Sequence, residues 1–173
     1  MANDVDNLRL GHCEVTYNSV DLGHTKGGCE VTLAQDTYEA TVDMYGSSPV
    51  KTFDKGLRVE VKVTLSEYQL DIMKAVIPSS TKVEGTGGSP VDALTFGKAA
   101  GDEIAGAPLL LHPIDGNSTD EDVNIYLAVP IGEVKLPYKI DEETTYEVTF
   151  LGLIDESKSD GNLIGKFGTA SSS

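Results

Sequence analysis

The stretch that most constrains the fold of this chain lies between Tyr17 and Gly46, where two turn-forming clusters flank one long strand-like segment. The residues expected to shape these turns are Asp21, Gly23, Thr25, Gly27 and Gly28, because glycine permits backbone angles that a β-carbon forbids and short polar side chains hydrogen-bond the nearby backbone. Between the clusters, Cys29, Val31 and Leu33 fall on one face of a strand. The block predicts strands joined by shaped turns, and nothing in it indicates catalysis.

The rest of the chain carries the same strand signal. Period-two alternation is clearest from Leu57 to Leu65, where one face is apolar and the other polar. Further strands are expected over residues 12–17, 28–34, 37–44, 108–114, 123–136 and 144–154. Pro130 and Gly132 predict a bulge or bend in the strand that contains them.

One helix is expected over about residues 66–77. Its apolar residues recur at helical spacing, Thr64 with Glu67 or Ser66 alone is expected to cap it, and Pro78 ends it. Long loops are expected at 46–56 and 78–106. The second is long for a structureless connection, so it is expected to hold short edge strands, or a helical turn at 91–94.

The chain of 173 residues predicts a single β-rich domain at 11–156 with a sizeable core. Residues 1–10 are expected to form an N-terminal arm carrying Leu8 and Leu10, and residues 157–173 a C-terminal arm with a disordered end. Leu163, Ile164 and Phe167 are the large apolar side chains of that second arm, and they predict docking on the same domain or on a neighbouring copy. No apolar run is long enough to cross a bilayer, and the N-terminus lacks the pattern of a secretory signal, so we expect a soluble protein made in a cytoplasm.

The charge balance excludes one large class of function. The formal net charge is −15, with only 13 scattered basic residues. Proteins that grip nucleic acids use clustered Lys and Arg to displace counterions. The acidic surface therefore predicts solubility and repulsion of phosphate, not specific binding of DNA or RNA.

Reactive constellations are weak. His12, Cys13, His24 and Cys29 lack the paired spacing of zinc ligands, and the two cysteines are read as core thiols, with a disulfide or a metal site less favoured. The acidic segment 115–122 fails the EF-hand pattern and is read as a solvated hairpin tip, and the glycines around Lys26 lack the order that cradles phosphate. The sequence thus predicts no catalytic residue, no metal and no cofactor.

A resemblance adds to this reading. The run YNSVDLGHTKGG at 17–28, followed by strands and by VDMYGSSPV at 42–50, resembles the major tail tube protein of long-tailed bacteriophages of the non-contractile, siphophage type. An early strand pair in that family reads roughly Asn-Gly-x-Asp-Leu-Gly-x-Thr-x-Gly-Gly, and an Asp-x-Tyr-Gly element follows. Ser19 stands here at the first of those glycines. The resemblance covers most of the chain loosely and residues 17–77 best.

The resemblance implies a β-sandwich or half-barrel with one flanking helix, forming stacked rings, usually hexameric, whose acidic lumen passes viral DNA without binding it. Implied partners are further copies of the chain and the tape-measure, tail terminator and distal tail proteins, in a virion tail assembled in the host cytoplasm. Contacts between subunits and rings would fall on Leu8, Leu10, Tyr45, Gly46, Ser47, Ser48, Pro49, Val50, Lys51, Phe53, Leu163, Ile164 and Phe167.

Other classes of protein stay open on the residues alone. A binding module, such as an immunoglobulin-like adhesion domain or a virion decoration domain, shares the short-strand pattern. A secretion-system tube protein of related fold is a further alternative, and an enzyme ranks last.

Overall fold

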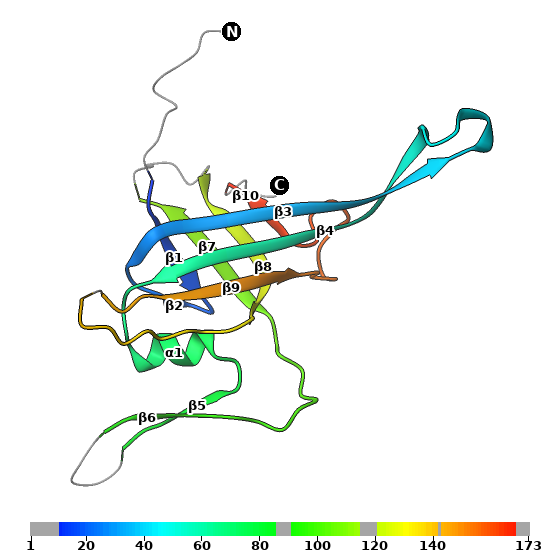
Figure 1. Ribbon diagram of the computed structural model, residues 1–173. Helices are drawn as coiled ribbons and strands as arrows, with labels where there is room; N and C mark the ends of the chain where they lie inside the picture. The colour runs from blue at the N-terminus through cyan, green and yellow to red at the C-terminus, as the bar shows by residue number, and fades with distance from the viewer. Residues whose placement is uncertain (1–10, 86–90, 115–120, 142, 169–173) are drawn as a thin grey trace.

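The computed structural model describes residues 11–85, 91–114, 121–141 and 143–168, and its architecture is a half-barrel of antiparallel strands with one flanking helix (Figure 1). In chain order the elements are β1 (Cys13–Tyr17), β2 (Val20–Asp21), β3 (Thr25–Thr41), the short 3₁₀ helix η2 (Asp43–Tyr45), β4 (Pro49–Leu65), α1 (Leu70–Val76), β5 (Ser80–Val83), β6 (Ala93–Phe96), β7 (Ala107–Pro113), β8 (Val123–Ile131), β9 (Tyr146–Leu153) and β10 (Gly165–Phe167). The mainly β fold class predicted from the sequence is confirmed.

The main sheet has the strand order β2-β1-β7-β8-β9-β4-β3, and β10 joins it beside β8. One edge of β8 is shared by two partners: β10 pairs with Val123–Ile125 and β9 with Leu127–Ile131. The sheet curls, so that β1 contacts β3 although the two strands do not pair. The helix α1 contacts β2 at one end of the sheet and the separate β5–β6 hairpin below it (Figure 1).

The core lies inside the curl, where the apolar faces of the strands meet α1. Alternation along β4 places Val59, Val61, Val63 and Leu65 inward, as the sequence predicted. The largest fully buried side chains are Tyr146, Phe150, Leu22, Leu65, Leu109 and Ile125. Tyr17 adds a tilted ring contact to Phe150, with ring centroids 4.8 Å apart, and its hydroxyl donates to the Ala128 carbonyl at 3.1 Å.

Several predicted boundaries are wrong. The two strands expected at 28–34 and 37–44 are one 17-residue strand, β3, and the loop expected at 46–56 is mostly strand, because β4 begins at Pro49. Strand β8 ends at Ile131 instead of 136. Its pairing with β9 is in continuous register through Pro130, so that pairing has no bulge, but the chain bends at Gly132, with a φ of 83°, which is the alternative that the sequence predicted. Residues 37–41 and 49–56 are exposed on both faces, apart from Ala40, so they lack the alternating burial that sequence periodicity detects.

The helix is shorter than expected and is capped differently. It spans Leu70–Val76, and its N-cap, Gln69, makes no side-chain capping hydrogen bond. Glu67, expected in the cap, instead bonds the backbone nitrogen of His24 at 3.1 Å. Segment 78–106 contains the short strands β5 and β6, as expected, and because Ala93–Phe96 is a strand the alternative of a helical turn at 91–94 is wrong.

Candidate self-assembly surface

The outer half of the β3–β4 hairpin projects from the body as an arm, which we define as residues 37–54 (Figure 1). The two strands pair across its whole length, from Thr37 opposite Asp54 to Thr41 opposite Pro49. All its residues are exposed except Ala40, which is half-buried, and no other element of the described chain pairs with it. Strand pairing therefore orders the arm, although none of its residues belongs to the core of the domain.

A bulge marks the point where the arm leaves the body. The pairing register shifts between Asp36 and Thr37, so the backbone of Lys55 has no paired residue in β3. The next residue, Gly56, adopts a positive φ of 130°. The Asp54 carboxylate accepts a hydrogen bond from the Gly56 nitrogen at 2.7 Å and another from the Gln35 side chain. Lys55 also forms an ion pair with Asp36, at 3.2 Å. These contacts fix the bulge, so the arm has a defined base.

The bulge changes which side of the ribbon is apolar. Within the body, Val31 and Leu33 lie on the same face of β3 as the core. At this bulge β3 has no inserted residue, so its alternation continues and places Tyr38 on the opposite face. Val42, which follows the strand in extended conformation, continues the same alternation. Phe53 lies directly across from Tyr38 and shares that face. The arm thus has an apolar side that points away from the core face of its own sheet.

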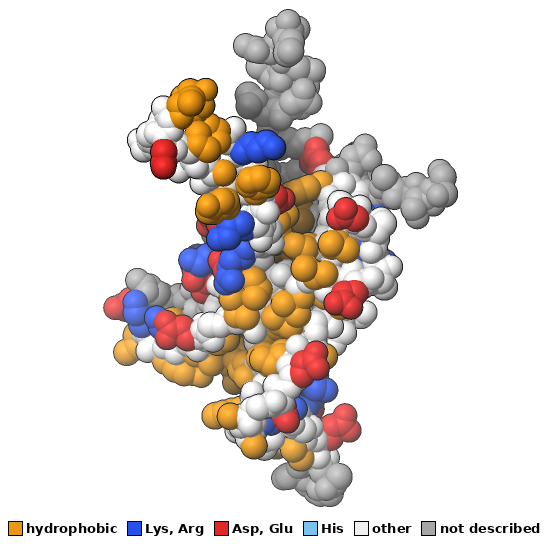
Figure 2. Space-filling view, turned by 90° about the vertical axis from the view of Figure 1, so that its right-hand side faces the viewer, with side chains coloured by type: hydrophobic (Ala, Val, Ile, Leu, Met, Phe, Trp, Pro, Cys, Tyr) orange, Lys and Arg blue, Asp and Glu red, His pale blue; other side chains and the backbone are white. Residues whose placement is uncertain are grey.

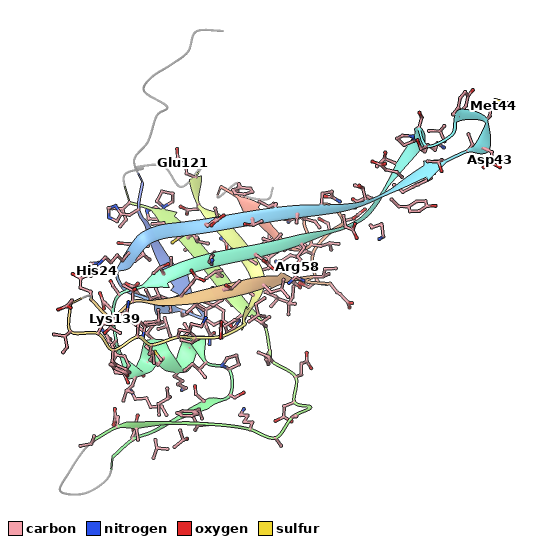
Figure 3. The ribbon with its side chains drawn as sticks, viewed as in Figure 1. His24, Asp43, Met44, Arg58, Glu121 and Lys139 are labelled. Atoms are coloured by element: carbon pink, nitrogen blue, oxygen red, sulfur yellow. The ribbon has the colours of Figure 1, made fainter. Side chains whose placement is uncertain are left out.

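That apolar side is open to solvent. The exposed large hydrophobic side chains of the arm are Tyr38 (58%), Val42 (45%), Met44 (83%), Tyr45 (60%), Val50 (46%) and Phe53 (51%). Hydrophobic side chains gather on the arm and on the body beneath it in Figure 2. Figure 3 places Asp43 and Met44 at the tip, far from Arg58 near the base. Apolar patches of this kind mark interaction sites in soluble proteins.

The residues predicted as contacts at the tip lie together on this arm. Gly46 follows η2 with a positive φ of 64°, which turns the chain back, and Ser47 and Ser48 complete the exposed tip. Pro49, Val50, Lys51 and Phe53 then run back along β4. What the sequence missed is that these positions form half of a paired hairpin and that Tyr38, Val42 and Met44 are further exposed apolar residues of the same arm.

The predicted contacts of the C-terminal segment separate into two groups. Leu163 and Ile164 are half-buried, and Ile164 packs against the core of its own domain. Phe167 is 63% exposed. Together with Leu33 and Leu57 at the base of the arm, they line an apolar groove of about 430 Å³. Leu8 and Leu10, also predicted as contacts, lie outside the described residues.

The residues predicted to shape turns have distinct roles. The Asp21 carboxylate accepts a hydrogen bond from the Gly23 nitrogen at 2.9 Å, and Gly23 has a φ of +73°. A β-carbon on Gly23 would lie 2.6 Å from the Glu67 carboxyl carbon, so this glycine makes room for the carboxylate that bonds His24. Nothing in the sequence pattern identified Glu67 as the partner of this turn.

The other predicted turn residues lie within β3. Thr25 begins the strand opposite Leu65. Gly27 and Gly28 both have positive φ and sit where the pairing register shifts, between Thr25 and Cys29. They therefore form a bulge within the strand and not a separate turn.

Two polar pairs stand out among the titratable groups. His112 Nδ1 lies 2.6 Å from Asp122 Oδ1, and this hydrogen bond raises the pKa of the imidazole. Cys13 and Cys29 are both free and half-buried, and their thiols are in hydrogen-bonding contact. Within the described ranges, no three His, Cys, Asp or Glu side chains gather closely enough to hold a metal ion. The acidic segment 115–120 lies outside those ranges.

The body of the sheet carries a group of charged side chains on its outward face. Across the outward face of β3, β4 and β9, Glu30, Glu60 and Glu147 alternate with Lys62, whose amino group pairs with Glu147 at 3.1 Å. Such exposed pairs contribute little to stability. No helix in the described part of the chain has the length and apolar character needed to span a membrane.

Comparison with models of known protein families found none that matches the chain, and a search of curated proteins found no significant match either.

Proposed function

We propose that this chain is a structural subunit that assembles with copies of itself into stacked rings, and that the resulting tube is the tail tube of a long-tailed bacteriophage. The observation that carries the proposal is the exposed apolar side of the arm of residues 37–54. Its apolar side is ordered by strand pairing yet has no covering element among the described residues. A second copy of the chain supplies that cover in an assembly.

The open edges of the sheet support the same proposal. Strand β3 has β4 as its single paired neighbour in the described structure, and β2 lies at the other end of the strand order. An unpaired edge offers backbone donors and acceptors to a neighbouring chain. Contacts of this kind that repeat around an axis close into rings, and contacts along the axis stack them.

The charge fits a conduit through which DNA passes. A net charge of −15 gives a surface that repels phosphate at long range. In this proposal the rings are hexameric, the lumen is acidic, and DNA transits without specific binding. The tube would meet the tape-measure, tail terminator and distal tail proteins in the virion, after assembly in the host cytoplasm, and it has no catalytic role.

The test replaces the two side chains at the tip, Met44→Ser with Tyr45→Ser. Burying each of these exposed groups in a subunit contact is worth about 1–2 kcal/mol, so their loss should raise the concentration needed for assembly roughly 30-fold or more. The variant should remain folded, because neither side chain belongs to the core. Negative-stain microscopy and sedimentation velocity measure the assembly.

A matched control changes the polar side of the same arm. Thr41→Ser with Thr52→Ser alters two exposed residues that lie on the face opposite Tyr38 and should leave assembly unchanged. Deleting Ser47–Lys55 is a poorer test, since it would remove most of one strand of the ribbon and leave the other unpaired. Rings or tubes that form equally well from the Met44 and Tyr45 variant would refute the role of the arm. A wild-type chain that stays monomeric at high concentration would refute the proposed function.

A further inference from the structure

The two cysteines of the chain meet at the place where the curled sheet nearly closes. Cys13 is the first residue of β1 and Cys29 lies in β3, and these strands stand near opposite ends of the strand order. The strands contact each other without pairing, and the two thiols lie in hydrogen-bonding contact. Both thiols are free and only half-buried, so small solutes can reach them.

Local structure on both strands explains this meeting. The bulge at Gly27 and Gly28 precedes Cys29 and shifts the register of β3 against β4. Cys13 is held on β1 opposite Pro113 of β7. Both cysteines pack against the edge of the same apolar core. The backbone therefore brings the sulfurs together through pairing that does not depend on any bond between them.

The contact makes the two sulfurs chemically unequal. The Cys29 thiol donates to the Cys13 sulfur, which lowers the pKa of Cys13, while the same contact and burial raise the pKa of Cys29. Because the thiolate is the attacking form in thiol–disulfide exchange, Cys13 is the more reactive of the pair.

We propose that Cys13 and Cys29 are a redox modification site, which a small disulfide such as glutathione disulfide converts into an intramolecular bond between β1 and β3. The Cys13 thiolate attacks one sulfur of glutathione disulfide. A mixed disulfide between Cys13 and glutathione forms, and the other glutathione leaves as its thiolate. Cys29 then loses its proton and attacks the Cys13 sulfur, which releases the second glutathione. The two protein thiols are oxidised by two electrons, and one glutathione disulfide is reduced to two glutathione molecules.

The bond would join the two ends of the open sheet covalently. The loop that it closes is short, comparable to the roughly 15-residue loops for which a crosslink restricts the unfolded chain substantially. The expected rise in melting temperature is about 6–12 °C for a chain of this size. A reducing cytoplasm keeps the pair as thiols, and release into an oxidising medium closes it. This inference is independent of the proposed role in a tail tube.

The experiment equilibrates the purified full-length chain in glutathione buffers of increasing oxidised fraction. The expected result is the loss of two reactive thiols together, a mass decrease of two hydrogens, a Cys13–Cys29 linked peptide after digestion, and the higher melting temperature. The reduced chain and the Cys13→Ser and Cys29→Ser variants serve as controls, and neither variant should show the temperature rise in oxidising buffer.

Other outcomes would overturn the proposal. Stable mixed disulfides with glutathione on both cysteines would show that the sulfurs do not reach each other. Linked peptides found only in covalent dimers would assign the oxidation to contacts between copies. Oxidation to the linked monomer without any rise in melting temperature would refute the stapling of β1 to β3.

Discussion

Replacing Gly23 with alanine tests how the turn between β2 and β3 is built. Gly23 has a φ of +73°, and an alanine methyl there would lie 2.6 Å from the Glu67 carboxyl carbon. The left-handed backbone costs an L-residue about 1–2 kcal/mol, offset partly by the lower entropy of the unfolded alanine chain. The Glu67 carboxylate must also move, and its hydrogen bond to the His24 nitrogen is lost at a cost of about 1–2 kcal/mol.

The expected total for Gly23→Ala is therefore about 2–3 kcal/mol of unfolding free energy, measured by urea denaturation. Gly27→Ala is the matched control. Gly27 has a φ of +92°, but a methyl there would meet nothing within 4 Å, so only the backbone penalty of about 1 kcal/mol is expected.

A double-mutant cycle separates the two contributions. In a Glu67→Ala background the side chain that the new methyl would displace is gone, so Gly23→Ala should cost no more than Gly27→Ala does. If Gly23→Ala and Gly27→Ala destabilised the wild-type chain equally, the close approach of Glu67 to Gly23 would have no energetic role and the reasoning would fail.

Three further predictions concern other turns and buried groups. Ser19 has a φ of +64°, so Ser19→Gly should stabilise the chain by about 0.5–1 kcal/mol, seen as a higher melting temperature; a decrease would contradict the strain. Burial raises the pKa of Tyr146 to about 12, and its hydroxyl donates to the Glu67 carbonyl. The stabilisation from this group is therefore complete below about pH 10 and is lost as the pH rises through 12. Tyr146→Phe should flatten this alkaline loss in urea titrations. The pKa of His112 is raised by its bond to Asp122, so its contribution is complete below about pH 6.5 and is lost as the pH rises through the folded value; His112→Gln should remove that slope.

The sequence predicted the fold wherever one face of a strand is buried. Alternation from Leu57 to Leu65 reported a real core face, because Val59, Val61 and Val63 point inward. The β3 half of the arm was predicted as a strand, but its β4 half was predicted as a loop, since both of its faces are exposed and residues such as Lys51 and Asp54 give no burial pattern. Strand pairing, not burial, orders this segment.

The candidate site shows the same division. The resemblance predicted contact residues between 45 and 53. It did not predict the apolar side of the arm, which depends on the strand register that pairs Phe53 with Tyr38. The prediction of the helix cap was wrong for a related reason. Glu67 has the spacing of a capping residue, yet its carboxylate is occupied by His24, a residue distant in sequence. Local spacing does not reveal such long-range competition.

Because one edge of β8 pairs with both β9 and β10, the C-terminal strand can leave the sheet without disturbing the rest of that edge. Strand β10 is only three residues long and completes the sheet beside Val123–Ile125, while β9 holds the remainder of that edge independently. If β10 detached, the main sheet would keep its order and expose a short vacant slot that fits the same strand of another copy. Domain swapping through the C-terminus thus requires no rearrangement of the barrel itself.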